Sequence, residues 1–235
     1  MPATKEITVY KWEELSQTAQ QRARDWYIEG LDYEWWEGVY EMAKADGYEL
    51  GFCVDHINFS GFCSQGDGAR WIGQVDVGAW LKAHAPDCIG VSALIALVNT
   101  GYLPKHARVI ASNSSNYCHE NTMDVEEMQE VDERLIDSND LDEIELELET
   151  LEGQGIFDGM SLANIRDIIN TDETNPFKLS NLSALDEAIE KSCKDYATKI
   201  YQQLREEYEY LCGEEMMLDH FNCNDYHFTE EGALA

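Results

Sequence analysis

The clearest periodic pattern in the chain is an apolar stripe near its C-terminus. Apolar side chains recur there every three or four residues, the spacing of one face of an α-helix, at Leu182, Leu185, Ile189, Cys193, Tyr196, Ile200, Leu204, Tyr208 and Leu211. A helix of about 30 residues, ~45 Å long, would carry the stripe. Gly213 follows directly and is a natural place for such a helix to end. We therefore predict a long amphipathic helix that packs on the rest of the chain.

Shorter helices are predicted at five other places. Ser16 is a suitable N-cap, and apolar residues at helical spacing follow it up to Tyr27. The same spacing predicts further helices over residues 33–45, 91–98, 162–169 and 216–221.

Strands are predicted where β-branched and aromatic residues gather in short runs. Two longer strands, over 50–59 and 69–77, are joined by a polar loop, and two more follow over 107–112 and 116–125. Short extended pieces are expected near residues 7–10 and 226–229. The fold class predicted from this order is α+β, with an antiparallel sheet of four to six strands and helices packed on it.

Three parts of one compact domain are expected from the same pattern. Residues 1–125 form a mixed helix and strand part, residues 126–176 an acidic and polar segment, and residues 177–235 the long helix, which packs back on the first part. The stretch 126–152 fits a helix or a strand, and its acid content favours a helix.

Charge is the strongest compositional feature, because 47 acids against 16 bases give a formal net charge of −31. The acids are unevenly spread: residues 61–123 are neutral overall, whereas residues 124–152 carry a net charge of −13 in 29 residues. Direct binding to nucleic acid or to an anionic membrane is not expected, since phosphate contacts need a basic surface. The N-terminus lacks a secretory pattern and no apolar run reaches the ~18 residues of a membrane span.

The acidic segment has two readings. As a helix it would carry one net charge per ~3.3 Å, close to the ~3.4 Å spacing along one DNA strand, so it could present a DNA-like surface to a basic partner. It could equally be a solubilising stretch. The candidate partner-binding residues are Asp124, Glu126, Glu127, Glu130, Asp132, Glu133, Asp137, Asp140, Asp142, Glu143, Glu145, Glu147 and Glu149.

The polar loop between the first two long strands is rich in glycine. Its Ser64, Gln65 and Asp67 could hold a small ligand or a metal, while Gly66 and Gly68 allow a positive φ or a close backbone approach. The loop lacks the lysine of a phosphate-binding loop. We favour a tight turn that fixes strand register, and the ligand loop remains the alternative.

The eleven residues 59–69, Phe-Ser-Gly-Phe-Cys-Ser-Gln-Gly-Asp-Gly-Ala, resemble the signature of a widespread family of bacteriophage proteins. Members are mostly uncharacterised, and some are labelled antitoxins of toxin–antitoxin systems. The resemblance extends along most of the chain, although Cys63 stands where a tryptophan is frequent, and Arg70 and Trp71 where a small residue and a phenylalanine are frequent. It implies a phage protein that acts in the cytoplasm of a bacterial host. It supplies no catalytic residues.

We do not predict an enzyme. The best candidate chemistry, Cys118, His119 and Glu120 with Cys63 or Asp67, needs side chains that would not converge, because neighbours on a strand point to opposite faces. The seven cysteines are odd in number and have no zinc-ligand spacing, so reduced thiols are expected. Neither a cofactor nor a metal is predicted, and the oligomeric state is left open, a homodimer included.

The resulting functional hypothesis is a phage inhibitor of a nucleic-acid-dependent host defence, of the CRISPR or restriction type. It would occlude a basic nucleic-acid-binding surface on a host protein or mimic DNA. The alternatives are an antitoxin-like regulatory binding protein, and a protein that binds a small ligand or metal through residues 64–68.

Overall fold

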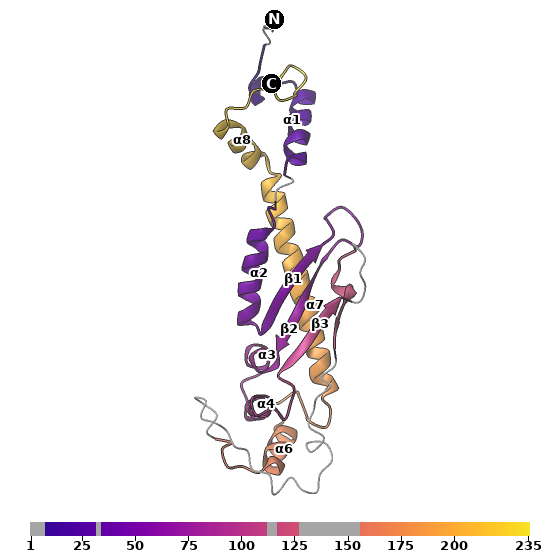
Figure 1. The fold of residues 1–235 in the computed structure, drawn as a ribbon, viewed down its shortest axis with the longest axis vertical. Helices are drawn as coiled ribbons and strands as arrows, with labels where there is room; N and C mark the ends of the chain where they lie inside the picture. The colour runs from indigo at the N-terminus through magenta and orange to yellow at the C-terminus, as the bar shows by residue number, and fades with distance from the viewer. Residues whose placement is uncertain (1–7, 32–33, 112–116, 127–155) are drawn as a thin grey trace, which may run out of the picture. The chain divides into compact units, whose positions relative to one another are not determined.

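The protein is described by a computed structural model for residues 8–31, 34–111, 117–126 and 156–235 (Figure 1). It divides into two compact units. The first combines the two ends of the chain, Met1–Val39 and Gln202–Ala235, and the second is continuous, Tyr40–Tyr201. The described part holds seven α-helices and one four-stranded antiparallel sheet, which confirms the predicted α+β class and the lower bound of the strand count.

The sheet lies in the second unit. Its strands follow chain order, each antiparallel to the next: β1 (Phe52–Phe59), β2 (Ala69–Asp76), β3 (His106–Ala111) and β4 (Met123–Val125). Burial alternates along β2, where Gly73 and Val75 are buried and Gln74 is exposed, so one face of the sheet forms core. A register shift between Val54 and His56 marks an irregularity in the first strand.

The core face of the sheet packs against helix α7 (Ser183–Leu211), the predicted long helix (Figure 1). Trp71 of β2 is fully buried, and its indole nitrogen donates to the Cys193 carbonyl at 3.1 Å. The Tyr196 ring lies 4.9 Å from that of Phe52. Most of the predicted stripe is buried, which confirms that it is the packing face. Helix α2 (Glu37–Glu49) adds a further contact, because the Tyr196 hydroxyl donates to the Ala43 carbonyl.

Helix α3 (Val77–His84) was not predicted, since its apolar residues had been assigned to the end of the preceding strand or left unassigned. Asp76 explains the change of structure. Its carboxylate accepts a hydrogen bond from the Ala79 amide at 2.9 Å, which caps the helix. The sequence pattern predicts a strand up to Val77, so it does not indicate that a helix begins after Asp76.

Helices α4 (Ile89–Asn99) and α6 (Leu162–Thr171) pack together in the same unit. Asp172 joins them, because its carboxylate accepts the Gly90 amide at 2.8 Å at the start of α4. The Thr174 hydroxyl, followed by the Gly90 and Thr174 amides, holds the pKa of Asp172 well below its usual range.

The first unit is built around helices α1 (Gln17–Glu29) and α8 (Glu214–Cys223), with a short 3-10 turn, η1 (Trp12–Glu14), before α1. Ser16 caps α1 as predicted, accepting the Ala19 amide at 3.3 Å. The ends of the chain pair through two backbone hydrogen bonds, from Tyr10 to Phe228 at 2.8 Å and back at 2.9 Å. The buried core includes Ala19, Ala23, Tyr27, Met217, Phe221 and Phe228.

Two predicted strands differ from the structure. Tyr10 forms an isolated bridge with Phe228, not a strand. In the 116–125 stretch only β4 is a strand, because residues Glu120–Thr122 form a 3-10 turn, η2, closed by hydrogen bonds of His119 with Thr122 and Asn121. The 127–152 part of the ambiguous acidic stretch lies outside the described residues. Within the described ranges, no helix is long and apolar enough to cross a membrane.

Candidate functional site

The glycine-rich loop between β1 and β2 is held by its own aspartate. One carboxylate oxygen of Asp67 accepts the backbone amides of Cys63 at 2.8 Å and Ser64 at 2.6 Å. The Asp67 amide in turn donates to the Ser64 carbonyl at 3.1 Å. Asp67 therefore acts as the internal cap of the turn, and this oxygen is occupied by the loop backbone.

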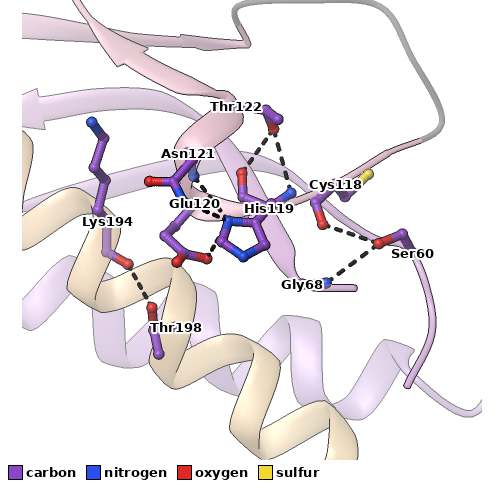
Figure 2. A network of polar contacts seen from close by, with 9 residues as sticks. All are labelled: Ser60, Gly68, Cys118, His119, Glu120, Asn121, Thr122, Lys194 and Thr198. Atoms are coloured by element: carbon purple, nitrogen blue, oxygen red, sulfur yellow. Dashed lines mark hydrogen bonds and ion pairs between the residues drawn. The ribbon is translucent and has the colours of Figure 1, made fainter. Parts of the chain in front are cut away.

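Ser60 and Gly68 close the base of the loop and join it to the segment before η2 (Figure 2). The Ser60 hydroxyl donates to the Cys118 carbonyl at 3.0 Å and accepts the Gly68 amide at 3.3 Å. A Cβ atom on Gly68 would lie 3.0 Å from the His119 Cα atom and 3.1 Å from the Cys118 carbonyl oxygen. The glycine is needed because two backbone segments approach closely here.

Gly66 is required for a second close approach, to an aromatic ring. A Cβ atom at this position would lie 2.2 Å from the Tyr117 hydroxyl oxygen and 2.7 Å from a carbon of the same ring. Among the glycines of the loop only Gly61 has a positive φ, of 114°. Of the two roles predicted for Gly66 and Gly68, close approach is the one that the structure shows.

A row of aromatic rings fixes the loop to helix α7. Phe62 lies between Phe59 and Tyr201, with ring centroids 5.5 Å and 5.6 Å away and planes inclined by less than 30°. The Tyr201 hydroxyl donates to the Gly61 carbonyl at 3.0 Å. The loop is thus attached at its base, within its turn and along one side, as expected for the structural role that we favoured.

His119 lies beside this loop, and its imidazole makes polar contacts with two residues, Asn121 and Glu120 (Figure 2). Its Nδ1 atom is 3.2 Å from the Asn121 amide, which donates to it, and 2.9 Å from a carboxylate oxygen of Glu120. The first contact needs a lone pair on Nδ1 and the second a proton, so they belong to different tautomers or protonation states of the ring. His119 is therefore a hydrogen-bonded polar residue.

The candidate nucleophile Cys118 does not meet this histidine. Figure 2 shows its sulfur pointing away from the imidazole, because His119 has an extended backbone and neighbouring side chains alternate. Burial raises the pKa of the Cys118 thiol, and Arg70 only partly opposes the shift. A buried, protonated thiol is a poor nucleophile.

The remaining predicted ligand residues, Ser64 and Gln65, lie at the exposed tip of the loop. The turn uses one oxygen of the Asp67 carboxylate, which holds this group against the loop backbone. The described residues contain no group of three or more His, Cys, Asp or Glu side chains placed to hold a metal ion.

Most of the predicted acidic partner-binding residues, from Glu127 to Glu149, lie outside the described residues. Asp124 and Glu126 are described, and both are exposed at the end of the sheet. Glu126 lies 3.8 Å from Arg108, in a pair whose members are largely exposed, so the pair contributes little to stability.

The first unit also has exposed acids on its surface, which the sequence pattern did not bring together. Its two chain segments together contain 17 acids and 5 bases, a net charge of −12 in 73 residues. On α1, Asp25 and Glu29 are four residues apart and exposed, and Glu215 and Asp219 on α8 repeat this spacing. Like charges at this spacing destabilise a helix slightly. Only the fold could have revealed this surface, because its acids come from opposite ends of the chain.

Removing the Asp67 carboxylate should destabilise the turn. Asp67→Ala leaves the exposed Cys63 and Ser64 amides to water, and we expect the free energy of unfolding to fall by about 0.5–1.5 kcal/mol. Asp67→Asn keeps one acceptor oxygen and should lose less. Urea denaturation followed by circular dichroism measures both changes, and equal stability of Asp67→Ala and the wild type would contradict the capping role.

Comparison with known proteins identifies one family. The family model described as "Domain of unknown function (DUF8835)" matches residues 35–214. No curated protein and no solved structure matches the chain significantly.

Proposed function

We propose that this chain, which belongs to the DUF8835 family, is a phage-encoded inhibitor that binds a basic host protein in place of nucleic acid. Its target would be a component of a CRISPR or restriction system in the bacterial cytoplasm. The proposal is supported above all by the amount of negative charge, a net −31, of which two places, the first unit and residues 124–152, carry −12 and −13.

The first place is the unit formed by the two chain ends. Asp25 and Glu29 on α1, and Glu215 and Asp219 on α8, are exposed. Each pair spans one helical turn, ~6 Å along the axis. Such acids repel one another in the free protein, and a basic partner would relieve that repulsion. Opposite charge also steers a partner during encounter and raises the association rate.

The second place is the acidic segment over 124–152, whose charge lies between two stretches of much lower charge density. The charge of either place would suit a groove that normally holds phosphates. A protein with this surface competes with nucleic acid for the groove and does not bind nucleic acid itself.

The test begins with partner capture. The immobilised protein is incubated at low salt with lysate of a bacterium that carries a restriction or CRISPR system, and duplex DNA is used for elution. We expect a nucleic-acid-binding protein to be captured and released by the DNA. Expression of the protein should also raise the plating efficiency of a phage that this defence restricts. Partners that DNA does not displace would contradict the proposal and support an antitoxin-like role.

Charge neutralisation then tests the surface. The variant Asp25→Asn, Glu29→Gln, Glu215→Gln, Asp219→Asn should bind the captured partner roughly 10- to 100-fold more weakly, if each lost pair contributes ~0.5 kcal/mol. Its affinity should also depend less on salt. Neutralising Asp137, Asp140, Asp142, Glu143, Glu145 and Glu147 tests the acidic segment in the same way.

A matched control removes four charges elsewhere. Glu41→Gln, Glu49→Gln, Asp55→Asn and Asp167→Asn replace exposed acids of the second unit. We expect this variant to keep most of the affinity. If both sets weaken binding equally, overall charge is responsible and the first unit is not the binding surface.

A further inference from the structure

The exposed side of the segment before η2 combines an aromatic surface with a carboxylate. Tyr117 and His119 are two residues apart on extended backbone, so they share one side, while Cys118 between them is buried at 4% exposure. The Tyr117 and His119 rings are parallel within 6°, with centroids 6.3 Å apart. This offset arrangement is favourable for aromatic pairs.

The Tyr117 ring is held in place although it is half exposed. It contacts Gly66 on one side and His119 on another, yet 50% of the residue remains open to solvent. A fixed and exposed aromatic side chain loses little conformational freedom when a partner binds to it. Tyrosines in this state are common at the centres of protein interfaces.

Glu120 places a negative charge next to these rings. Its side chain is 29% exposed, with a carboxylate oxygen 2.9 Å from the His119 Nδ1 atom. This contact uses one carboxylate oxygen of Glu120, and the side chain stays partly exposed beside the imidazole. The exposed tip of the glycine-rich loop carries the side chains of Ser64 and Gln65, which make no hydrogen bond within the described part of the chain.

We propose that Tyr117 and Glu120 form a recognition site for an arginine side chain of the partner protein. A guanidinium group is a flat cation that can stack on an aromatic face and donate hydrogen bonds to a carboxylate. Lysine offers no flat face for stacking. A nucleobase could stack on Tyr117, but its phosphates would meet a protein of net charge −31. The inference rests on the proposed function, since basic nucleic-acid-binding surfaces are rich in arginine.

The experiment compares two peptides of equal length and charge, one alternating arginine with glycine and the other lysine with glycine. Fluorescence anisotropy of labelled peptides gives both dissociation constants at physiological ionic strength. We expect the wild type to bind the arginine peptide roughly two- to fivefold more tightly, as expected for an exposed cation–aromatic contact. Tyr117→Phe should keep this preference, because the ring remains.

Loss of the ring should remove the preference. Tyr117→Leu fills similar space without an aromatic face, so the two dissociation constants should become similar while the charge-driven part of binding remains. Tyr48→Leu is the matched control, because Tyr48 is 72% exposed on helix α2, and it should behave as the wild type. An unchanged preference in Tyr117→Leu, with a normal melting temperature, would overturn the site.

Glu120→Gln tests the same site without touching the ring, and remains informative if Tyr117→Leu folds poorly. It should reduce the preference, whereas Asp124→Asn, an exposed acid nearby in sequence, should not. If both variants reduce the preference for the arginine peptide equally, the proposed arginine site is also wrong. If the four-charge variant of the first unit weakens both peptides equally while Tyr117→Leu changes nothing, the proposed function survives and only this inference fails. If the wild type prefers the arginine peptide but DNA does not displace the captured partner, this inference survives and the proposed function fails.

Discussion

Replacing Trp71 by alanine is expected to lower the free energy of unfolding by about 3–5 kcal/mol. The side chain is fully buried between the sheet and α7, with its ring 5.4 Å from that of Phe52. Alanine would leave a cavity in the core where the sheet packs against α7. It would also remove the indole donor to the Cys193 carbonyl. Urea denaturation followed by far-ultraviolet circular dichroism measures the loss.

Trp71→Phe separates the two contributions. Phenylalanine keeps most of the apolar volume and loses the indole N–H, so we expect a smaller loss of about 1–2 kcal/mol. A loss below about 1 kcal/mol in Trp71→Ala would be inconsistent with cavity formation, and would mean that α7 does not pack on the sheet as described.

Gly68→Val is expected to lower the free energy of unfolding by about 1–3 kcal/mol through overpacking. The new side chain would collide with the backbone of Cys118 and His119, which cannot move without breaking the Ser60 hydrogen bonds. Thermal and urea unfolding measure the effect. Gly38→Ala is the control, because a Cβ atom there meets nothing within 4 Å and the position is in a helix. Its stability should be equal to that of the wild type or slightly higher.

Substitutions at the loop tip are expected to leave stability unchanged. Ser64→Ala and Gln65→Ala change exposed side chains that the turn does not use, so their melting temperatures should match the wild type. Partner affinity, measured on the same variants, shows whether the tip also takes part in binding. Unfolding of Gln65→Ala would mean that the tip supports the turn after all.

The long helix and the sheet could be predicted from the sequence because their signals are local and repeated. Apolar residues at three- and four-residue spacing predict α7, and a short run with β-branched and aromatic residues predicts β2. Helix α3 is not predicted because the apolar pattern of the preceding strand continues past Asp76, the residue that caps the helix. A single capping residue is a weak signal against a continuous apolar run.

The candidate site could be predicted only in part from the sequence, for a different reason. The glycine-rich motif was visible, but the reason for Gly66 and Gly68 is contact with residues 117–119, some 50 positions away. No local pattern contains that information. The alternation of Tyr117, Cys118 and His119 was the available signal, since a strand prediction already places the first and third on one side.

The pairing of Tyr10 with Phe228 has a consequence for biosynthesis. At about 5–20 residues per second, a ribosome needs roughly 10–45 s to travel from one of these residues to the other. During that interval the apolar face of α1, with Ala19, Ala23 and Tyr27, has no α8 to cover it. The sheet of the second unit waits almost as long, because α7, which covers its core face, is synthesised directly before α8. Both units therefore complete their cores only late in synthesis, and until then the nascent protein depends on chaperones or on its own charge to stay in solution.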